Sequence, residues 1–131
     1  MTSRIVLITI DAVEPRKVAD FWRAALGWKI AEESADAVRI VADDGTGMSV
    51  DVVPVPEPKV VKNRLHLDLR ADGITSAEEL ERLTVLGARQ IDIGQGPDAL
   101  WWVLTDPEGN EFCLFFRTVQ EAEQPPARLV P

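Results

Sequence analysis

The strongest constraint on the fold is that the chain presents the same order of elements twice. Residues 5–11 (IVLITID) are rich in β-branched residues and predict a strand. A helix is predicted from Pro15 to just before Gly27, since proline suits a first helical turn and glycine the position past the end. Its apolar positions recur at helical spacing and are Val18, Phe21, Trp22, Ala25 and Leu26. Strands are predicted at 28–32, 37–42 and 48–53.

The second half repeats this order. Residues 64–70 (RLHLDLR) alternate as a strand does, and Thr75 and Glu78 have the spacing of a capping box at the start of a helix. We expect Ala77, Leu80 and Leu83 on the buried side of this helix. Strands are predicted at 89–93, 99–105 and 111–116. The two predicted helices end on the same Leu-Gly pair, Leu26-Gly27 and Leu86-Gly87, 60 positions apart. This period indicates two copies of one β-α-β-β-β unit.

The length of 131 residues fits one domain built from these two copies. We expect a single domain over residues 1–119, with module one at 3–55 and module two at 63–117. A proline-rich hinge at 54–63 joins the modules. The C-terminal tail at 120–131 is expected to be either disordered or an arm across a partner.

Charge and cysteine content restrict the partners and the compartment. The 14 Lys and Arg residues against 22 Asp and Glu give a net charge of −8, which repels nucleic acids and anionic membranes. The apolar run IVLITI ends at Asp11, so it is too short for a signal-peptide core or a membrane span. The single cysteine, Cys113, forms no internal disulfide and is compatible with a reducing compartment. We expect a cytoplasmic protein with no nucleic-acid or membrane partner.

Strand alternation predicts which side chains point away from the face that the helix covers. In residues 64–70, which hold the only histidine, the leucines at 65, 67 and 69 are expected to point toward the helix. Arg64, His66, Asp68 and Arg70 then point away. A slip of one residue in register would reverse any such assignment. By the same parity, the helix side receives Val6, Ile8, Ile10, Val50, Val52, Phe112, Leu114 and Phe116. The opposite side receives Leu7, Thr9, Asp11, Ser49, Asp51, Val53, Glu111, Cys113 and Phe115.

Three motifs in this order resemble the vicinal oxygen chelate superfamily: FW…ALGW at the end of the first helix, HLDL at the start of the second copy, and DPEGNEF near the end. This superfamily contains glyoxalase I, extradiol dioxygenases, fosfomycin-resistance enzymes and bleomycin-resistance binding proteins. The resemblance extends from Ile5 to Phe116. It implies an α+β fold in which two tandem βαβββ modules form curved mixed sheets around a central cup, with the helices on the convex face.

The resemblance also implies where a metal would be bound. Family members with metal chemistry hold one divalent ion with a ligand from each first strand, usually His, and one from each last strand, usually Glu or Gln. His66 falls on the histidine position of the second copy. The other three positions depart from this pattern and carry Leu7 or Thr9, Val53 or Asp51, and Cys113. We therefore expect no metal cofactor. The alternative is one divalent ion held by His66, Asp51 and Glu111.

The predicted cup suggests a binding site for an organic ligand. His66 either bonds Asp68 at the rim or lines the pocket as a hydrogen-bond partner or general base. Trp101 and Trp102 are adjacent in a strand and must face opposite sides of the sheet, so one of them can line the cup. The acidic lining favours a cationic or polyhydroxylated ligand. The candidate ligand-binding residues are His66, Asp68, Trp101, Trp102, Trp28, Thr9, Asp51 and Cys113.

These observations favour a glyoxalase-like, bleomycin-resistance-like protein that binds a small, partly aromatic molecule in its cup. Such a protein would sequester a drug and confer antibiotic resistance without the complete family metal site. One alternative is a metal-dependent lyase, isomerase or dioxygenase of the glyoxalase type. Another is metal-free acid–base catalysis by His66 with Asp68 or Glu111, so the sequence leaves open whether the protein is an enzyme. A homodimer is the favoured assembly.

Overall fold

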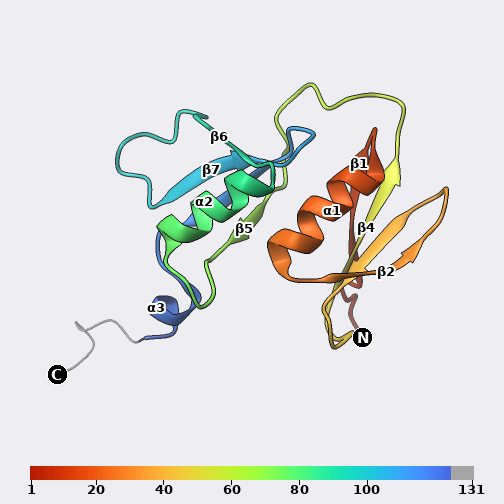
Figure 1. The fold of residues 1–131 in the computed structure, drawn as a ribbon, viewed down its shortest axis with the longest axis horizontal. Helices are drawn as coiled ribbons and strands as arrows, with labels where there is room; N and C mark the ends of the chain where they lie inside the picture. The colour runs from red at the N-terminus through yellow and green to blue at the C-terminus, as the bar shows by residue number, and fades with distance from the viewer. Residues whose placement is uncertain (125–131) are drawn as a thin grey trace. The chain divides into compact units, whose positions relative to one another are not determined.

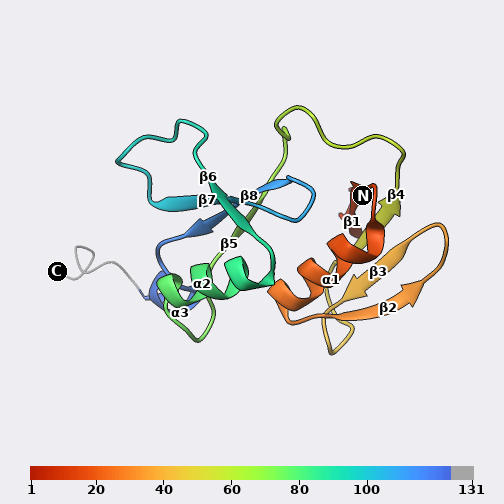
Figure 2. The same cartoon turned by 45° about the horizontal axis from the view of Figure 1, so that its top comes forward.

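The computed structural model describes residues 1–124 and contains two four-stranded sheets, each with one long helix against it (Figures 1 and 2). The chain divides into two compact units. Unit 1 comprises Met1–Val61 together with Asp106–Gly109, and unit 2 comprises Lys62–Thr105 together with the residues from Asn110 on. Among the described residues, no helix has both the length and the apolar character needed to cross a membrane.

Unit 1 follows the predicted order of elements. Its strands are β1 (Leu7–Ala12), β2 (Lys29–Glu33), β3 (Val38–Val41) and β4 (Ser49–Pro54), and its helix is α1 (Pro15–Leu26). The strand order in the sheet is β1-β4-β3-β2. β1 pairs parallel to β4, whereas the other neighbours are antiparallel.

Unit 2 repeats this arrangement. Its elements are β5 (Leu67–Leu69), α2 (Ser76–Leu86), β6 (Arg89–Ile91), β7 (Trp101–Thr105) and β8 (Glu111–Phe115), followed by α3 (Val119–Glu123). The strand order is β5-β8-β7-β6, again with one parallel pair, β5 and β8. The α+β class, the two βαβββ modules and the curved mixed sheets are thus confirmed. A cup shared by both modules stays a prediction.

Helix α1 forms and docks as its sequence predicts. Val18, Phe21 and Trp22 are buried, and Pro15 occupies the first turn. Gly27 ends the helix at φ 69°, a left-handed conformation that glycine adopts without a Cβ clash, and its N–H bonds the Arg23 carbonyl. The sheet residues beneath α1 are buried valines and isoleucine, namely Val38, Ile40, Val50 and Val52.

The turn Asp106–Gly109 contacts both the start of α1 and its buried face. The Glu108 carboxylate accepts hydrogen bonds from the Val13 and Glu14 N–H groups, at 2.8 and 2.7 Å. These donors have no partner within the helix, and a negative charge at this end is favoured by the helix dipole. Asp106 is buried and accepts a hydrogen bond from Trp22 Nε1 at 3.0 Å. The turn therefore belongs to unit 1 by its contacts.

Helix α2 begins as predicted, but the residues that it buries differ from those predicted. Thr75 and Glu78 form the complete capping box. Leu83 is fully buried, but Ala77 is exposed, so its predicted burial is wrong. Glu79 takes the buried position instead, where its carboxylate receives two hydrogen bonds from Arg82, at 2.6 and 2.7 Å. This pairing allows a charged side chain to be buried one helical turn from Leu83.

Strands β5 and β1 begin later than predicted, near the starts of their parallel partners β8 and β4. β5 starts at Leu67, and Leu65 is 89% exposed, so its predicted burial is wrong. Leu67 lies opposite Phe112, so Leu65 would need to pair with Asn110, which precedes β8. In the same way β1 starts at Leu7, opposite the first residue of β4, and leaves Val6 exposed instead of buried.

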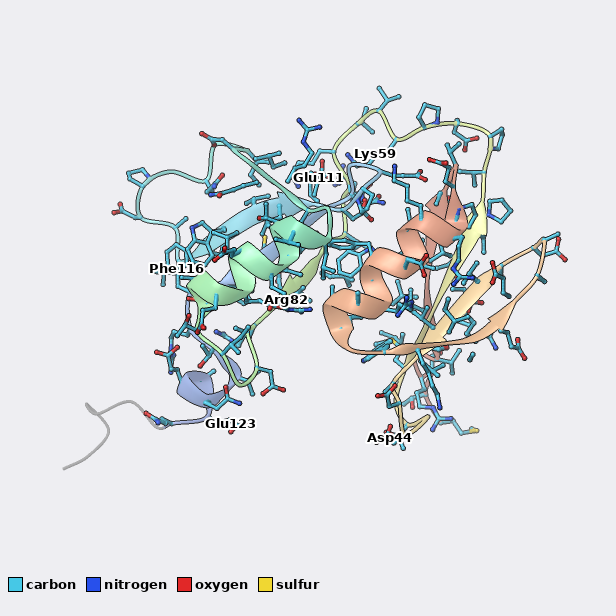
Figure 3. The ribbon with its side chains drawn as sticks, viewed as in Figure 1. Asp44, Lys59, Arg82, Glu111, Phe116 and Glu123 are labelled. Carbon is cyan, nitrogen blue, oxygen red and sulfur yellow. The ribbon has the colours of Figure 1, made fainter. Side chains whose placement is uncertain are left out.

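The end of the second module also departs from the prediction. β8 ends at Phe115, and Phe116 (Figure 3) is 37% exposed instead of buried. Its ring packs against that of Trp102 at a centroid distance of 4.6 Å. The expected tail begins with α3, where Gln120 Nε2 donates to Asp72 at 2.7 Å and its Oε1 accepts from the Gly73 N–H. The rest of the predicted tail, residues 125–131, lies outside the described residues.

Candidate functional site

Each sheet has an open face, defined here as the face opposite its long helix. In unit 1 a single row of side chains crosses all four strands on this face. Thr9 lies beside Asp51, Asp51 beside Arg39, and Arg39 beside Glu32. The predicted parity of β1 and β4 is consistent with this register, since Thr9 is exposed while Val50 and Val52 are buried under α1.

The centre of this row is a bidentate ion pair. Arg39 Nε and Nη2 donate to the two Asp51 carboxylate oxygens at 2.7 and 2.9 Å. The hydrogen bond from Arg39 lowers the pKa of the Asp51 carboxyl below its usual value. A cavity of about 350 Å³ opens beside the pair, within the size range of small-molecule pockets. Its lining residues are Glu32, Glu33, Ser34, Ala37, Arg39 and Asp51.

The lowered pKa of Asp51 predicts how the Arg39→Met variant responds to pH. Since the folded-state pKa is depressed, the pair contributes stability above the unfolded-state pKa of about 3.9. This contribution disappears as pH falls through the folded-state pKa. We expect Arg39→Met to have a lower Tm than the parent at pH 7 and the two curves to converge as pH falls below about 4. Lys29→Met, which removes another cation of the same sheet, is the control. A difference in Tm between the parent and Arg39→Met that stays constant with pH would contradict a stabilising ion pair between Arg39 and Asp51.

In unit 2 the open face holds three potential ligand or catalytic groups. Asp68 on β5 lies directly opposite Cys113 on β8. His66, just before β5, places Nδ1 3.2 Å from Asp68 Oδ1. One donor atom from each of the three residues lies within 4.8 Å of the others. The structure therefore brings together His66, Asp68 and Cys113, three of the predicted site residues.

Cys113 differs from its two neighbours in exposure. Its residue surface is 7% exposed, whereas the side chains of His66 and Asp68 are 38% and 43% exposed. Burial, and after it the negative charge of Asp68, raises the pKa of the Cys113 thiol to about 11. The thiol is therefore protonated at neutral pH and is a poor nucleophile by itself.

An aromatic platform lies on the same face, two residues further along β8. The Arg70 guanidinium lies 4.6 Å above the centre of the Phe115 ring, and Trp101 meets that ring edge-on at 6.4 Å. Arg70 is fixed by a hydrogen bond to the Arg117 carbonyl at 2.9 Å. Trp102 points to the opposite face, where its cross-strand partner is the buried Leu114. Sequence reasoning missed Arg70 and Phe115 as site residues, although strand parity placed both on this side.

The remaining predicted residues lie outside the group of His66, Asp68 and Cys113. Trp28 follows Gly27 in unit 1 and is half-buried. Glu111 accepts a hydrogen bond from the Asn63 N–H at 3.0 Å. Asp51 belongs to unit 1, whereas His66 and Glu111 belong to unit 2, so the alternative metal set of these three stays a prediction.

The residues present do not fit the four-ligand metal site that the resemblance implies. Leu7 and Val53 carry no donor atom, and Thr9 offers only a hydroxyl group. Asp51, the other candidate on β4, has both oxygens bonded to Arg39. Only His66 and Cys113 remain as donors at the family's positions.

Paired βαβββ modules with polar open faces define this chain as a protein of the glyoxalase type. Its sequence matches the glyoxalase-like domain model over residues 7–115, and the chain belongs to this family. No curated protein matches the sequence significantly.

Solved structures share the fold at low sequence identity. FosX, the fosfomycin resistance protein from Listeria monocytogenes crystallised with Mn(II) and sulfate, is 17% identical with a TM-score of 0.68, covering 92% of this chain and 95% of its own. A glyoxalase/bleomycin resistance protein/dioxygenase family enzyme from Burkholderia phytofirmans PsJN is 16% identical with a TM-score of 0.64, covering 86% and 97%. TnmS3, an antibiotic binding protein from Streptomyces sp. CB03234, is 20% identical with a TM-score of 0.60, covering 87% and 95%.

Proposed function

We propose that this protein binds and sequesters a small, partly aromatic molecule, without the family's four-ligand metal site. The observation that carries the proposal is the aromatic platform of Trp101, Phe115 and Arg70 on the open face of unit 2, beside the polar groups of His66 and Asp68. This combination suits a ligand with a flat apolar part and a polar substituent.

Physical chemistry favours a planar ligand at this platform. An aromatic contact contributes about 0.5–1.5 kcal/mol beyond the area that it buries. Trp101 and Phe115 are half-buried, so part of each side chain is available to a ligand. The Arg70 guanidinium lies over the Phe115 ring and is already held by a hydrogen bond to a backbone carbonyl. Arg70 therefore loses little conformational freedom when a ligand binds. Such a preorganised surface loses little entropy on binding.

Charge favours a ligand that carries a basic group. The chain has a net charge of −8, and Asp68 provides an exposed carboxylate near the platform. A cationic substituent would be attracted to Asp68, whereas the net charge of the chain would outweigh Arg70 and disfavour a phosphonate. TnmS3 is named as an antibiotic binding protein, which supports ligand binding as one use of this fold. We therefore place planar cationic natural products first among the candidate ligands.

Tryptophan fluorescence titration tests the proposal. We expect planar cationic antibiotics such as bleomycin-type compounds to quench the emission saturably and the non-aromatic phosphonate fosfomycin to give no response. Trp101→Ala should raise Kd by roughly tenfold, the equivalent of about 1.4 kcal/mol. Trp28→Phe is the matched control and should leave Kd unchanged. A flat response across the panel, or an equal loss of affinity in both variants, would contradict the proposal.

A further inference from the structure

Among residues 1–124, a single group of three or more histidine, cysteine and acidic side chains places its donor atoms within reach of one ion, namely His66, Asp68 and Cys113. We propose that these three residues form a binding site for a thiophilic divalent cation of the zinc type, built entirely within unit 2. This goes beyond the proposed ligand binding and does not depend on it.

The backbone positions two of the three donors before any ion arrives. Asp68 and Cys113 are neighbours across the parallel ladder of β5 and β8, so their Cα positions are fixed by the sheet. Ligand atoms around a tetrahedral zinc ion lie roughly 3.5 Å apart, given bond lengths of about 2.0–2.3 Å. The contact of 3.2 Å between His66 and Asp68 is already near this spacing. Side-chain rotations can therefore close the group around an ion without moving the strands.

The chemistry of the donor set selects the class of ion. An imidazole nitrogen, a carboxylate oxygen and a thiolate sulfur suit zinc and cobalt, whereas magnesium, calcium and manganese prefer oxygen ligands. The Cys113 thiol is protonated in the free protein and releases its proton to solvent when the ion binds. Three protein ligands would leave one position of a tetrahedral ion open. His66 and Asp68 are exposed and allow the ion to enter, while Cys113 is buried.

The site differs from the family pattern in a way that this structure explains. That pattern distributes its ligands over both modules and has a carboxylate where this chain has Cys113. Here the positions in unit 1 lack free donors, because Asp51 is bonded to Arg39 and Leu7 carries none. Asp68, which the pattern does not use, supplies the carboxylate instead. The exchange of one carboxylate for a thiol shifts the preference from manganese toward zinc.

Cobalt substitution in the full chain tests the site directly. After removal of metal with a chelator, titration with Co²⁺ should saturate at one ion per chain and give a thiolate-to-cobalt charge-transfer band in the near ultraviolet. Zn²⁺ should displace the cobalt and abolish the band, while Mg²⁺ and Mn²⁺ should not. Cys113→Ser should remove the band, and His66→Gln and Asp68→Asn should each weaken binding by at least tenfold.

Matched controls keep the outcome specific to these three residues. Asp98→Asn, an exposed acid of the same unit outside the group, and Glu111→Gln should both bind cobalt like the parent. Circular dichroism checks that every variant is folded, and the exposed His66 provides a variant that tests the site even if Cys113→Ser does not fold. The proposal is overturned if no stoichiometric binding occurs, if the band persists without the thiol, or if Glu111→Gln loses the ion while Cys113→Ser retains it.

Discussion

Replacing Trp22 by alanine is expected to lower the free energy of unfolding by about 3–5 kcal/mol. Trp22 is 2% exposed on the buried side of α1 and meets Phe21 edge-on at 5.2 Å. Its removal leaves a large cavity between α1 and the sheet and deletes the hydrogen bond to the buried Asp106. Urea unfolding followed by far-ultraviolet circular dichroism measures the loss.

Two further variants separate the contributions at this position. Trp22→Phe retains most of the ring but deletes the N–H donor to Asp106, so we expect a smaller loss than with alanine. Trp28→Ala removes the same side chain from a half-buried position and should cost less again. An equal loss for Trp22→Ala and Trp28→Ala would contradict the core position of Trp22.

Phe112→Ala is the second substitution for which we expect a large effect, again about 3–5 kcal/mol. Phe112 is fully buried on the helix side of β8, between Leu67 on β5 and Leu104 on β7. Alanine there removes the largest side chain in the core of unit 2. Phe115→Ala, on the same strand but the open face, is the matched control.

We expect Phe115→Ala to cost less than half as much stability, since Phe115 is half-buried. The same variant should weaken the binding of a planar ligand if the aromatic platform is the binding surface. Denaturant midpoints and fluorescence titrations on both variants test this. Comparable destabilisation by the two substitutions would show that the faces of β8 have been assigned wrongly.

Local patterns in the sequence were sufficient to predict most of the fold. Helical spacing identified α1, the Thr75–Glu78 capping box located the start of α2, and Gly27 marked the left-handed end of α1. Errors occurred at strand ends, as with Leu65, because the length of a ladder depends on a partner strand that is distant in sequence. The spacing of apolar residues and the strand propensity of a segment carry no information about where its partner strand begins or ends.

The candidate site was predictable only in part, for the same physical reason. Parity placed His66, Asp68 and Cys113 on the face away from the helix, but their proximity depends on the register between β5 and β8. Likewise, the pairing of Arg39 with Asp51 follows from the register of β3 against β4. The placement of Arg70 over Phe115 is a tertiary contact that no local motif encodes.

The assignment of the turn Asp106–Gly109 to unit 1 limits how the gene for this protein could be divided. A fragment that ends at Val61 would lack Glu108, which receives the N–H groups at the start of α1, and Asp106, which receives that of Trp22. The duplicated halves are therefore not interchangeable parts. Deleting the second copy would remove side chains on which the first copy relies.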